Sequence, residues 1–365
     1  MKVLITGGHL TPAIATIEAL SDWGAVYVGR KYSMEADQAP SLEHQEIPRL
    51  GVKFIEVNPA RIQRKFSRGT IPAVFRGPKG FLEAFGIIRN EKPDVVLCFG
   101  GYVQIPFVFA AYILRIPIIL HEQTFEAGLS NKLSSKFAKF ICISHESSRK
   151  YFPENKTILT GNPVRKEIFE SDEKTPLPKG NDPLIFVTGG SQGSHFINEL
   201  ISNNLSTLLL NYRIIHQTGA SEKFHDFESL KDKSTDKYSV YKFIPPNKIG
   251  YVLKNADLVI ARGGANTIWE LFLLKKKAII IPLSFSQKQE QLKNANFLSE
   301  VGLAKILEEG DFSNSDFLLA VNDMIKSKEE FKSDISYPSN PSTKIVEVIE
   351  NAIKTKNKKV SKKSS

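Results

Sequence analysis

The stretch best suited to chemistry is a glycine pair, Gly263-Gly264, which separates an apolar run at 257–261 from a helical pattern at 268–274. Glycines at a strand-to-helix turn let the backbone approach a ligand and leave the first helical N–H groups free. Those groups and the helix dipole favour an anion such as a diphosphate. Glu270 lies beyond Gly264 by about 9 Å, since a helix rises about 1.5 Å per residue. Its carboxylate could accept hydrogen bonds from ribose hydroxyls, and the alternative is a tight turn followed by a solvated glutamate.

A second candidate for chemistry is His9, in the segment Thr6-Gly7-Gly8-His9. This segment follows the apolar run 3–5 and precedes an amphipathic helical pattern at 12–20 with proline near its start. At such a turn the helix N-terminus would lower the pKa of an imidazole and keep it available as a base. The alternative is a histidine that only caps the helix.

The elements that must position these residues are strands, because each glycine pair in the chain follows a strand-like run. The pairs are Gly7-Gly8, Gly100-Gly101, Gly189-Gly190 and Gly263-Gly264, two in each half of the chain. Ligands of open α/β sheets bind beyond the carboxyl ends of the strands, which is where these loops belong. The sequence therefore predicts an α/β protein with two doubly wound parallel sheets whose loops face one crevice.

Composition is that of a globular protein with room for two domains: 365 residues, 41% apolar and 24% charged. No apolar run reaches the roughly 20 residues of a membrane span, since Pro106, Arg115 and Pro117 interrupt the longest. Lys2 leads directly into a strand, so we expect no signal peptide. Cys98 and Cys142 lie inside apolar runs, which predicts buried thiols in a reducing cytosol instead of a disulfide or a metal site.

The net charge of +10 is concentrated in two segments. Residues 354–365 carry lysines and no acid, and we expect a disordered tail. Residues 61–92 are basic and also apolar, which suits an anionic membrane surface; the alternative is core aromatics beneath a solvated face. No nucleic-acid-binding signature accompanies this charge, so nucleic acid is not an expected partner. The residues predicted to contact the membrane are Arg64, Lys65, Arg68, Phe75, Arg76, Phe81 and Phe85, with Ile88 beside them.

Domain boundaries follow from the order of strands and loops. Residues 1–162 form the first predicted domain, whose sheet we expect to close with the strand at 140–143. Residues 163–337 form the second, and the connection lies at 161–165. An amphipathic pattern at 343–353 predicts a final helix that crosses back to the first domain.

Several motifs are spread over residues 1–350. They are Thr6-Gly7-Gly8-His9 with Pro12, Gly100-Gly101-Tyr102-Val103, His121-Glu122-Gln123 with Ala127-Gly128-Leu129 and Asn131-Lys132, Gly161-Asn162-Pro163-Val164-Arg165, Gly189-Gly190-Ser191-Gln192-Gly193, and Glu270 with Gln291 and Asn294-Ala295. Together these motifs resemble those of the MurG family, the bacterial transferases that add N-acetylglucosamine to lipid I during peptidoglycan synthesis. The chain departs from the family pattern at Leu4-Ile5 and Ala13, where glycines are usual, and at Thr124, where the family has asparagine. Gly263-Gly264 stands where the family commonly has Ser-Gly.

The resemblance implies a GT-B glycosyltransferase fold, with the donor in the C-terminal domain and the acceptor and membrane contact in the N-terminal domain. His9 would act as the catalytic base, with Glu122 as the next candidate. Ser191 would meet phosphate, the backbone of Ile244 the uracil, and Glu270 the ribose. The residues implied to bind UDP-N-acetylglucosamine are Thr6, Gly7, Gly8, Thr124, Arg165, Ser191, Ile244, Ala265, Asn266, Thr267, Ile268, Trp269, Glu270 and Gln291.

The implied reaction is an inverting transfer of N-acetylglucosamine from UDP-N-acetylglucosamine to the C4 hydroxyl of the muramoyl sugar of lipid I, which forms lipid II. The resemblance also implies a peripheral protein at the cytoplasmic face of the bacterial inner membrane. No Asp-X-Asp pair occurs in the sequence, so a metal-bridged diphosphate is not expected. We also expect no cofactor. Three alternatives stay open: a transferase for another lipid-linked acceptor, a UDP-N-acetylglucosamine 2-epimerase, and a non-catalytic nucleotide-sugar-binding protein.

Overall fold

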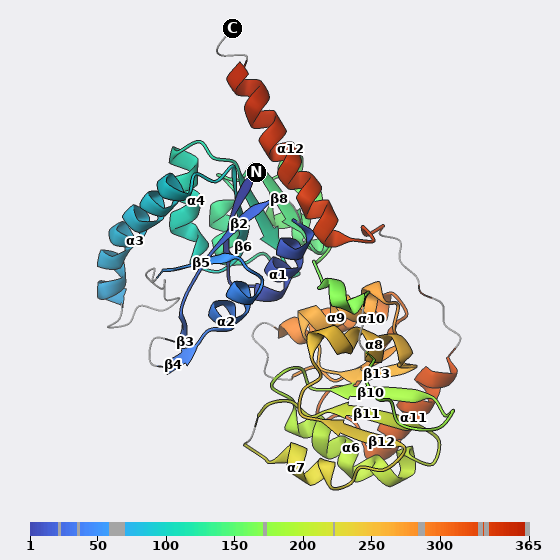
Figure 1. Ribbon diagram of the computed structural model, residues 1–365. Helices are drawn as coiled ribbons and strands as arrows, with labels where there is room; N and C mark the ends of the chain where they lie inside the picture. The colour runs from blue at the N-terminus through green and yellow to red at the C-terminus, as the bar shows by residue number, and fades with distance from the viewer. Residues whose placement is uncertain are drawn as a thin grey trace. The chain divides into compact units, whose positions relative to one another are not determined.

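The computed structural model describes residues 1–20, 23–34, 37–57, 70–170, 174–221, 223–283, 289–327, 331 and 336–361. For residues 33–40, 70–78 and 356–361 it describes no side chains. The chain forms two compact units (Figure 1). Unit 1 comprises Met1–Arg165 and Tyr337–Ser365, and unit 2 comprises Lys166–Ser336.

Unit 1 is built on a seven-stranded parallel sheet of order β5-β2-β1-β6-β7-β8-β9. The order runs outward in both directions from β1, so it reverses between β1 and β6, which pair directly. This reversal is the point where doubly wound sheets bind their ligands. The strands are β1 (Lys2–Gly7), β2 (Gly24–Gly29), β5 (Lys53–Glu56), β6 (Val95–Phe99), β7 (Ile118–Glu122), β8 (Phe140–Ile143) and β9 (Thr157–Leu159); β3 (Tyr32–Met34) and β4 (Asp37–Pro40) form a separate antiparallel pair.

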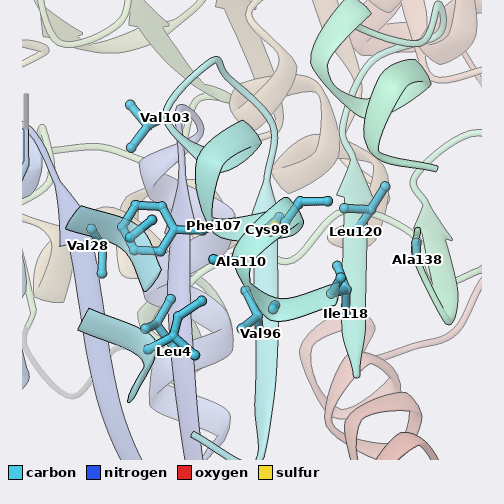
Figure 2. Close-up of a cluster of buried hydrophobic side chains, with 14 of the residues drawn as sticks. Leu4, Val28, Val96, Cys98, Val103, Phe107, Ala110, Ile118, Leu120 and Ala138 are labelled. Carbon is cyan, nitrogen blue, oxygen red and sulfur yellow. The ribbon is translucent and has the colours of Figure 1, made fainter. Parts of the chain in front are cut away.

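Successive side chains of these strands enter two different cores, because side chains alternate across a sheet. Leu4, Val96 and Leu120 pack with Phe107 of helix α4 (Gln104–Ile113), as Figure 2 shows. The opposite face carries Val3 and Ile5. Helix α3 (Thr70–Glu91) joins α4 on the first face, and α1 (Leu10–Ala19) covers the second. Both faces are covered, which accounts for the continuous apolar runs of these strands.

The last helix of the chain, α12 (Pro341–Ser361), belongs to unit 1 and lies beside α1. Its side chains Ile345, Val348 and Ile349 are buried with those of α1 and the sheet. The helix continues to Ser361, whereas the sequence predicts a disordered tail from residue 354. The prediction that the strand at 140–143 closes the sheet is wrong, because β9 pairs with it in parallel and becomes the edge.

Unit 2 is built on a six-stranded parallel sheet of order β12-β11-β10-β13-β14-β15, and this order reverses between β10 and β13. The two sheets confirm the predicted doubly wound fold. The strands are β10 (Leu184–Thr188), β11 (Arg213–Gln217), β12 (Tyr238–Tyr241), β13 (Leu258–Ala261), β14 (Ala278–Ile280) and β15 (Ala304–Ile306).

Helices cover both faces of the second sheet (Figure 1). Side chains of α6 (His195–Leu208) and α11 (Asn314–Lys326) form one core with the strands. The Trp269 ring of α9 (Ala265–Leu273) meets the Phe272 ring edge to face and contacts the tilted Phe297 ring of α10 (Glu290–Glu300). The remaining elements are α2 (Leu42–Arg49), α5 (Leu129–Ser134), α7 (Asp226–Lys231), α8 (Pro246–Asn255) and the 3-10 turns η1 (Glu146–Tyr151), η2 (Glu154–Lys156) and η3 (Lys166–Ile168).

The two cysteines are free and buried, as the sequence predicts. Burial raises the pKa of the Cys142 thiol to about 12 and also raises that of Cys98. In the described ranges no helix is both long and apolar enough to cross a membrane. The same ranges contain no group of three or more His, Cys, Asp or Glu residues that could hold a metal ion.

Candidate functional site

In unit 1 the two glycine loops interlock at the point where the strand order reverses. A Cβ on Gly7 would lie 2.6 Å from the backbone nitrogen of Phe99, so β1 and β6 approach more closely there than any side chain allows. The Gly8 N–H donates to the Gly100 carbonyl at 3.1 Å. Gly101 has φ +76°, a left-handed conformation that favours glycine. The predicted loops therefore form one continuous backbone surface.

His9 lies on this surface at the N-cap position of α1, and its side chain makes no capping hydrogen bond. The imidazole packs over the neighbouring loop, since a Cβ on Gly100 would lie 3.2 Å from His9 Cδ2. Close beneath it, His121 is fully buried, and burial lowers its pKa to about 3. The proximity of His9 also contributes to that lowering. The His121 ring is therefore neutral at neutral pH and places no positive charge beside His9.

Glu122 is 2% exposed, and both of its carboxylate oxygens are occupied by donors. Oε1 accepts from the Thr124 N–H at 3.1 Å and from the Thr124 hydroxyl at 2.7 Å. Oε2 accepts from the Gly128 N–H at 2.8 Å and from Asn131 Nδ2 at 3.1 Å. Such a carboxylate orients the segment around Thr124, and it has no lone pair directed at a substrate without rearrangement. This geometry favours a positioning role for Glu122.

Two other predicted residues of unit 1 hold polar atoms that are buried and have no hydrogen-bond partner among the described residues. Thr6 is fully buried, and its hydroxyl has no such partner. Arg165 is the last residue of this part of unit 1 and is half-buried. Its Nε atom is buried and also has no partner among the described residues. Buried polar groups are normally paired, so each is a position that a bound ligand or water would satisfy.

Unit 2 contains a cavity of about 630 Å³ where its strand order reverses. The loop after β10 forms one wall, and the start of α9 forms another. Gly264 is the N-cap of α9, and no atom of another described part of the chain lies within 4 Å of where its Cβ would be, so among these residues the helix N-terminus is open. The lining residues are Gly189, Gly190, Gln192, Gly193, Ser194, His195, Phe196, Glu199, Arg262, Gly264, Thr267, Leu283, Gln291 and Glu309.

Two glycines of this region are required by close packing. A Cβ on Gly193 would lie 2.0 Å from the Thr218 carbonyl oxygen, and Gly193 has φ +83°. A Cβ on Gly263 would lie 2.3 Å from the Gln291 carbonyl oxygen. Asn294 strengthens the second contact by donating to the Gly263 carbonyl at 2.9 Å. The glycine loops are thus held against neighbouring loops that the sequence alone does not place beside them.

The predicted donor residues differ in their access to this cavity. Thr267 and Gln291 line it, and Ser191 is exposed on the adjoining loop. Ile268 and Trp269 are fully buried, so their side chains are core residues, and their place in the predicted set stays a prediction. Three further members, Ala265, Asn266 and Glu270, are half-exposed on α9.

Ile244 is held by a residue that the sequence analysis does not identify. Its N–H donates to Gln217 Oε1 at 2.9 Å, and Gln217 Nε2 donates to the Thr188 hydroxyl at 3.1 Å. Thr188 in turn accepts from the Gly190 N–H at 3.0 Å. Gln217 therefore connects the loop predicted to hold phosphate with the segment predicted to hold uracil.

Arg262 is a second residue that sequence reasoning missed. It is 8% exposed, and its guanidinium pairs with Glu309 at 2.6 Å and donates to the Ser194 hydroxyl at 3.0 Å. It also donates to the Ile281 carbonyl at 3.1 Å. Arg262 thus ties three separate elements together at the floor of the cavity, and no local signal reveals partners so distant in sequence.

The predicted membrane-contacting residues fall into three groups. Arg64, Lys65 and Arg68 lie outside the described residues, and Phe75 and Arg76 lie on α3 with undescribed side chains. Phe81 and Phe85 are half-buried against the core of unit 1. Ile88 is 1% exposed and cannot contact a lipid surface, which corrects its inclusion.

Other apolar side chains are exposed on the same pair of helices. Leu82 of α3 is 68% exposed, and α4 packs against α3. On α4, Tyr112 and Ile113 are more than half exposed. Both helices of this packed pair therefore carry exposed apolar side chains.

Two parallel-sheet units, each with glycine loops where its strand order reverses, define the GT-B class of glycosyltransferase architecture. Two family models match the chain: the glycosyltransferase family 28 N-terminal domain at residues 6–143, and the corresponding C-terminal domain at residues 184–353. A UDP-N-acetylglucosamine–N-acetylmuramyl-(pentapeptide) pyrophosphoryl-undecaprenol N-acetylglucosamine transferase of Clostridium tetani is 32% identical, covering 98% of this chain and 99% of the relative. The enzyme of the same name from Clostridium perfringens is also 32% identical, covering 95% and 97%.

Solved structures agree on the fold. MurG of Acinetobacter baumannii superposes with a TM-score of 0.68 at 22% identity, covering 96% of this chain and 99% of that one. A UDP-N-acetylglucosamine 2-epimerase from Methanocaldococcus jannaschii gives 0.63 at 17% identity, covering 96% and 100%. The chain belongs to the MurG family of glycosyltransferases, within family 28.

Proposed function

We propose that this protein transfers N-acetylglucosamine from UDP-N-acetylglucosamine to the C4 hydroxyl of the muramoyl sugar of lipid I, with inversion at C1. The observation that carries the proposal is the full-length similarity to the clostridial transferases, whose names state this donor group and acceptor. The site supports the same conclusion, since the loops at both strand-order reversals contain glycines where no larger residue fits, Gly7 in unit 1 and Gly193 and Gly263 in unit 2.

The donor would bind in unit 2, with its diphosphate at the open N-terminus of α9 and its ribose at Glu270. Breaking the C1–O bond leaves the electron pair on the diphosphate, so developing negative charge must be stabilised there. Gly264 and the loop from Gly189 to Gly193 present backbone to the cavity in which this charge develops. Preorganised N–H groups and helix dipoles stabilise such charge with little reorganisation.

The acceptor would bind in unit 1, where His9 removes the proton of the attacking hydroxyl. The imidazole packs over the backbone of the Gly100 loop, which would orient it toward the acceptor. Glu122 would hold Thr124 beside this site through the hydrogen bonds described above. Thr124, which stands where the family has asparagine, thus offers a hydroxyl that the buried Glu122 carboxylate holds in place.

Incubation of the full chain with UDP-N-acetylglucosamine and a lipid I analogue tests the proposal. A disaccharide-bearing lipid and UDP are the expected products. Formation of the C2 epimer of the donor without acceptor would instead assign the epimerase alternative. UDP-N-acetylglucosamine binding without any product would leave a nucleotide-sugar-binding protein, and transfer to a different lipid-linked sugar would change the acceptor.

Glu270→Ala is expected to raise the KM for UDP-N-acetylglucosamine. Removal of a charged hydrogen-bond partner costs about 1–3 kcal/mol, which corresponds to an increase of about 5- to 150-fold. The kcat should change less, because the ribose is remote from the bond that breaks. Steady-state kinetics at varied donor concentration measures both, with Glu228→Ala, an exposed glutamate of α7, as the control. An unchanged donor KM in the folded variant excludes the assigned role of Glu270.

We also expect the protein to dock on an anionic membrane surface through α3 and its neighbours. The reason is that the polyprenyl tail of lipid I stays in the bilayer, so the enzyme must approach the membrane to reach the acceptor sugar. Reversal of Arg64, Lys65, Arg68 and Arg76 to Glu should abolish sedimentation with anionic vesicles, since each cation near such a surface contributes about 1 kcal/mol. Leu82→Ser should weaken sedimentation without changing the charge.

The matched control for the charge reversal has the same net charge change but lies in unit 2. It converts Lys223, Lys231, Lys233 and Lys326, all exposed, to Glu. Both variants are compared in a chain that ends at Ile353, which removes the lysine-rich segment 354–365. Equal loss of binding in the two variants would show that only total charge matters and that the docking surface is not at α3.

A further inference from the structure

A chain of hydrogen bonds leads from the core of unit 2 to the wall of the cavity. Tyr238 and His216 are both fully buried, and the Tyr238 hydroxyl lies 2.9 Å from His216 Nδ1. The other ring nitrogen, His216 Nε2, lies 3.0 Å from Asn198 Oδ1. Asn198 Nδ2 lies 2.8 Å from Asp226 Oδ2, and Asp226 Oδ1 lies 2.8 Å from His195 Nδ1. None of these residues belongs to the set predicted to bind the donor.

The direction of each bond in this chain follows from its neighbours. Asn198 Nδ2 also donates to the Thr218 carbonyl at 3.1 Å, which fixes the amide orientation and makes Oδ1 an acceptor. His216 Nε2 must therefore carry a proton. Burial lowers the pKa of His216 to about 3, so the ring is neutral and its Nδ1 accepts from the Tyr238 hydroxyl. One oxygen of Asp226 is thus held by a fixed donor, which orients its other oxygen toward His195.

His195 is the first residue of α6 and lines the cavity beside the glycine loop. Its ring stacks on Phe224 with centroids 3.9 Å apart and planes 11° from parallel. With Nδ1 bonded to Asp226, the imidazole is fixed in both position and rotation. Nε2 has no hydrogen-bond partner in the parts of the chain that the structure describes, and the side chain is 41% exposed.

Among the described residues that line the cavity, His195 is the basic side chain that is not already paired with a carboxylate of the lining. Arg262, the other basic residue of the lining, is paired with Glu309. Glu199 lies one turn further along α6 and also lines the cavity. Lys223 lies over the Phe224 ring, 5.0 Å from its centroid, and is not part of the lining.

We propose that His195, oriented by Asp226, binds the terminal phosphate of a nucleoside diphosphate in this cavity. In the bound state both ring nitrogens donate, Nδ1 to Asp226 and Nε2 to a phosphate oxygen, which is the imidazolium form. When the C1–O bond breaks, the electron pair passes to that phosphate group, and His195 stabilises it by a charged hydrogen bond without transferring a proton. This inference rests on the proposed function and names the contact for its leaving group.

Calorimetric titration of the full chain with uridine, UMP and UDP tests the assignment, because only UDP carries the terminal phosphate. His195→Gln is expected to weaken UDP binding about tenfold, the size of a charged hydrogen bond, and to leave UMP and uridine affinity unchanged. His195→Arg, which restores a cation, should bind UDP within a few-fold of the unmodified protein. The unchanged ligands also establish that each variant is folded.

The Asp226→Asn variant separates the orientation of the His195 ring by Asp226 from the charge that His195 itself carries. It should weaken UDP binding less than His195→Gln does, and should add nothing in the double variant, because both changes act through one contact. The control is His225→Asn, which removes an exposed histidine next to Asp226 that does not line the cavity. His225 has φ +51°, a conformation that asparagine tolerates, so the control adds no strain.

The outcomes distinguish this inference from the proposed function. If the unmodified protein does not bind UDP, the proposed donor fails. If it binds UDP and His195→Gln does not change that affinity, the role of His195 is overturned while the proposed function stands. Equal weakening of UMP and UDP also overturns the assignment, because the contact would then be with the inner phosphate.

Discussion

His9→Ala is expected to lower kcat about 10²- to 10⁴-fold, the usual contribution of a general base, while UDP affinity changes little. His9 lies in unit 1 on the interlocked glycine loops, and the residues that line the cavity predicted to bind the nucleotide belong to unit 2. Loss of the imidazole should therefore affect proton removal from the acceptor and not retention of the nucleotide. Single-turnover transfer from bound donor, together with UDP titration, measures the two effects separately.

His9→Gln serves as the conservative variant, because it keeps a hydrogen-bonding side chain but cannot take up a proton. It should be as slow as the alanine variant if His9 is the base. Turnover close to that of the unmodified protein in His9→Gln would assign His9 to positioning. Collapse of UDP binding with surviving turnover would make it a structural residue, and Glu122 would be the next group to test.

A chain that ends at Asn340 is expected to lose the fold of unit 1. The removed helix α12 buries Ile345, Val348, Ile349 and Ile353 against α1 and the sheet. Full burial of one such side chain contributes about 1.5–3 kcal/mol, so four contribute roughly 6–12 kcal/mol. That sum is comparable with the whole free energy of unfolding of an ordinary domain, about 5–15 kcal/mol. Thermal unfolding followed by near-ultraviolet circular dichroism should show the loss.

The matched control ends at Ile353 and retains every residue of α12 whose side chain the structure describes as buried. It also retains the Ala352 carbonyl, which accepts from Lys139 Nζ at 2.8 Å. This chain should unfold at nearly the same temperature as the full protein. An unchanged transition in the chain that ends at Asn340 would mean that α12 is not part of the cooperative core of unit 1.

Sequence alone determined the strands, the glycine loops and the family, because these depend on local patterns. The apolar run that ends at Ala261 is too short for a helix and predicts a buried strand, and Gly263-Gly264 predicts a turn in which backbone comes close to another group. The structure agrees, since β13 ends at Ala261 and a side chain on Gly263 would collide with the Gln291 carbonyl. The return of the chain at 343–353 was likewise predicted from its apolar periodicity.

Only the tertiary structure decided which side chains of those elements face a ligand and which partners they have. Ile268 and Trp269 lie in the same helical turn as Thr267, yet they are core residues, because the packing of α9 on the sheet selects its inward face. Arg262 meets Glu309, and His195 meets Asp226, across separations of tens of residues. Propensity and periodicity act over a few neighbouring residues, whereas these pairs exist only because folding brings distant loops to one edge of a sheet.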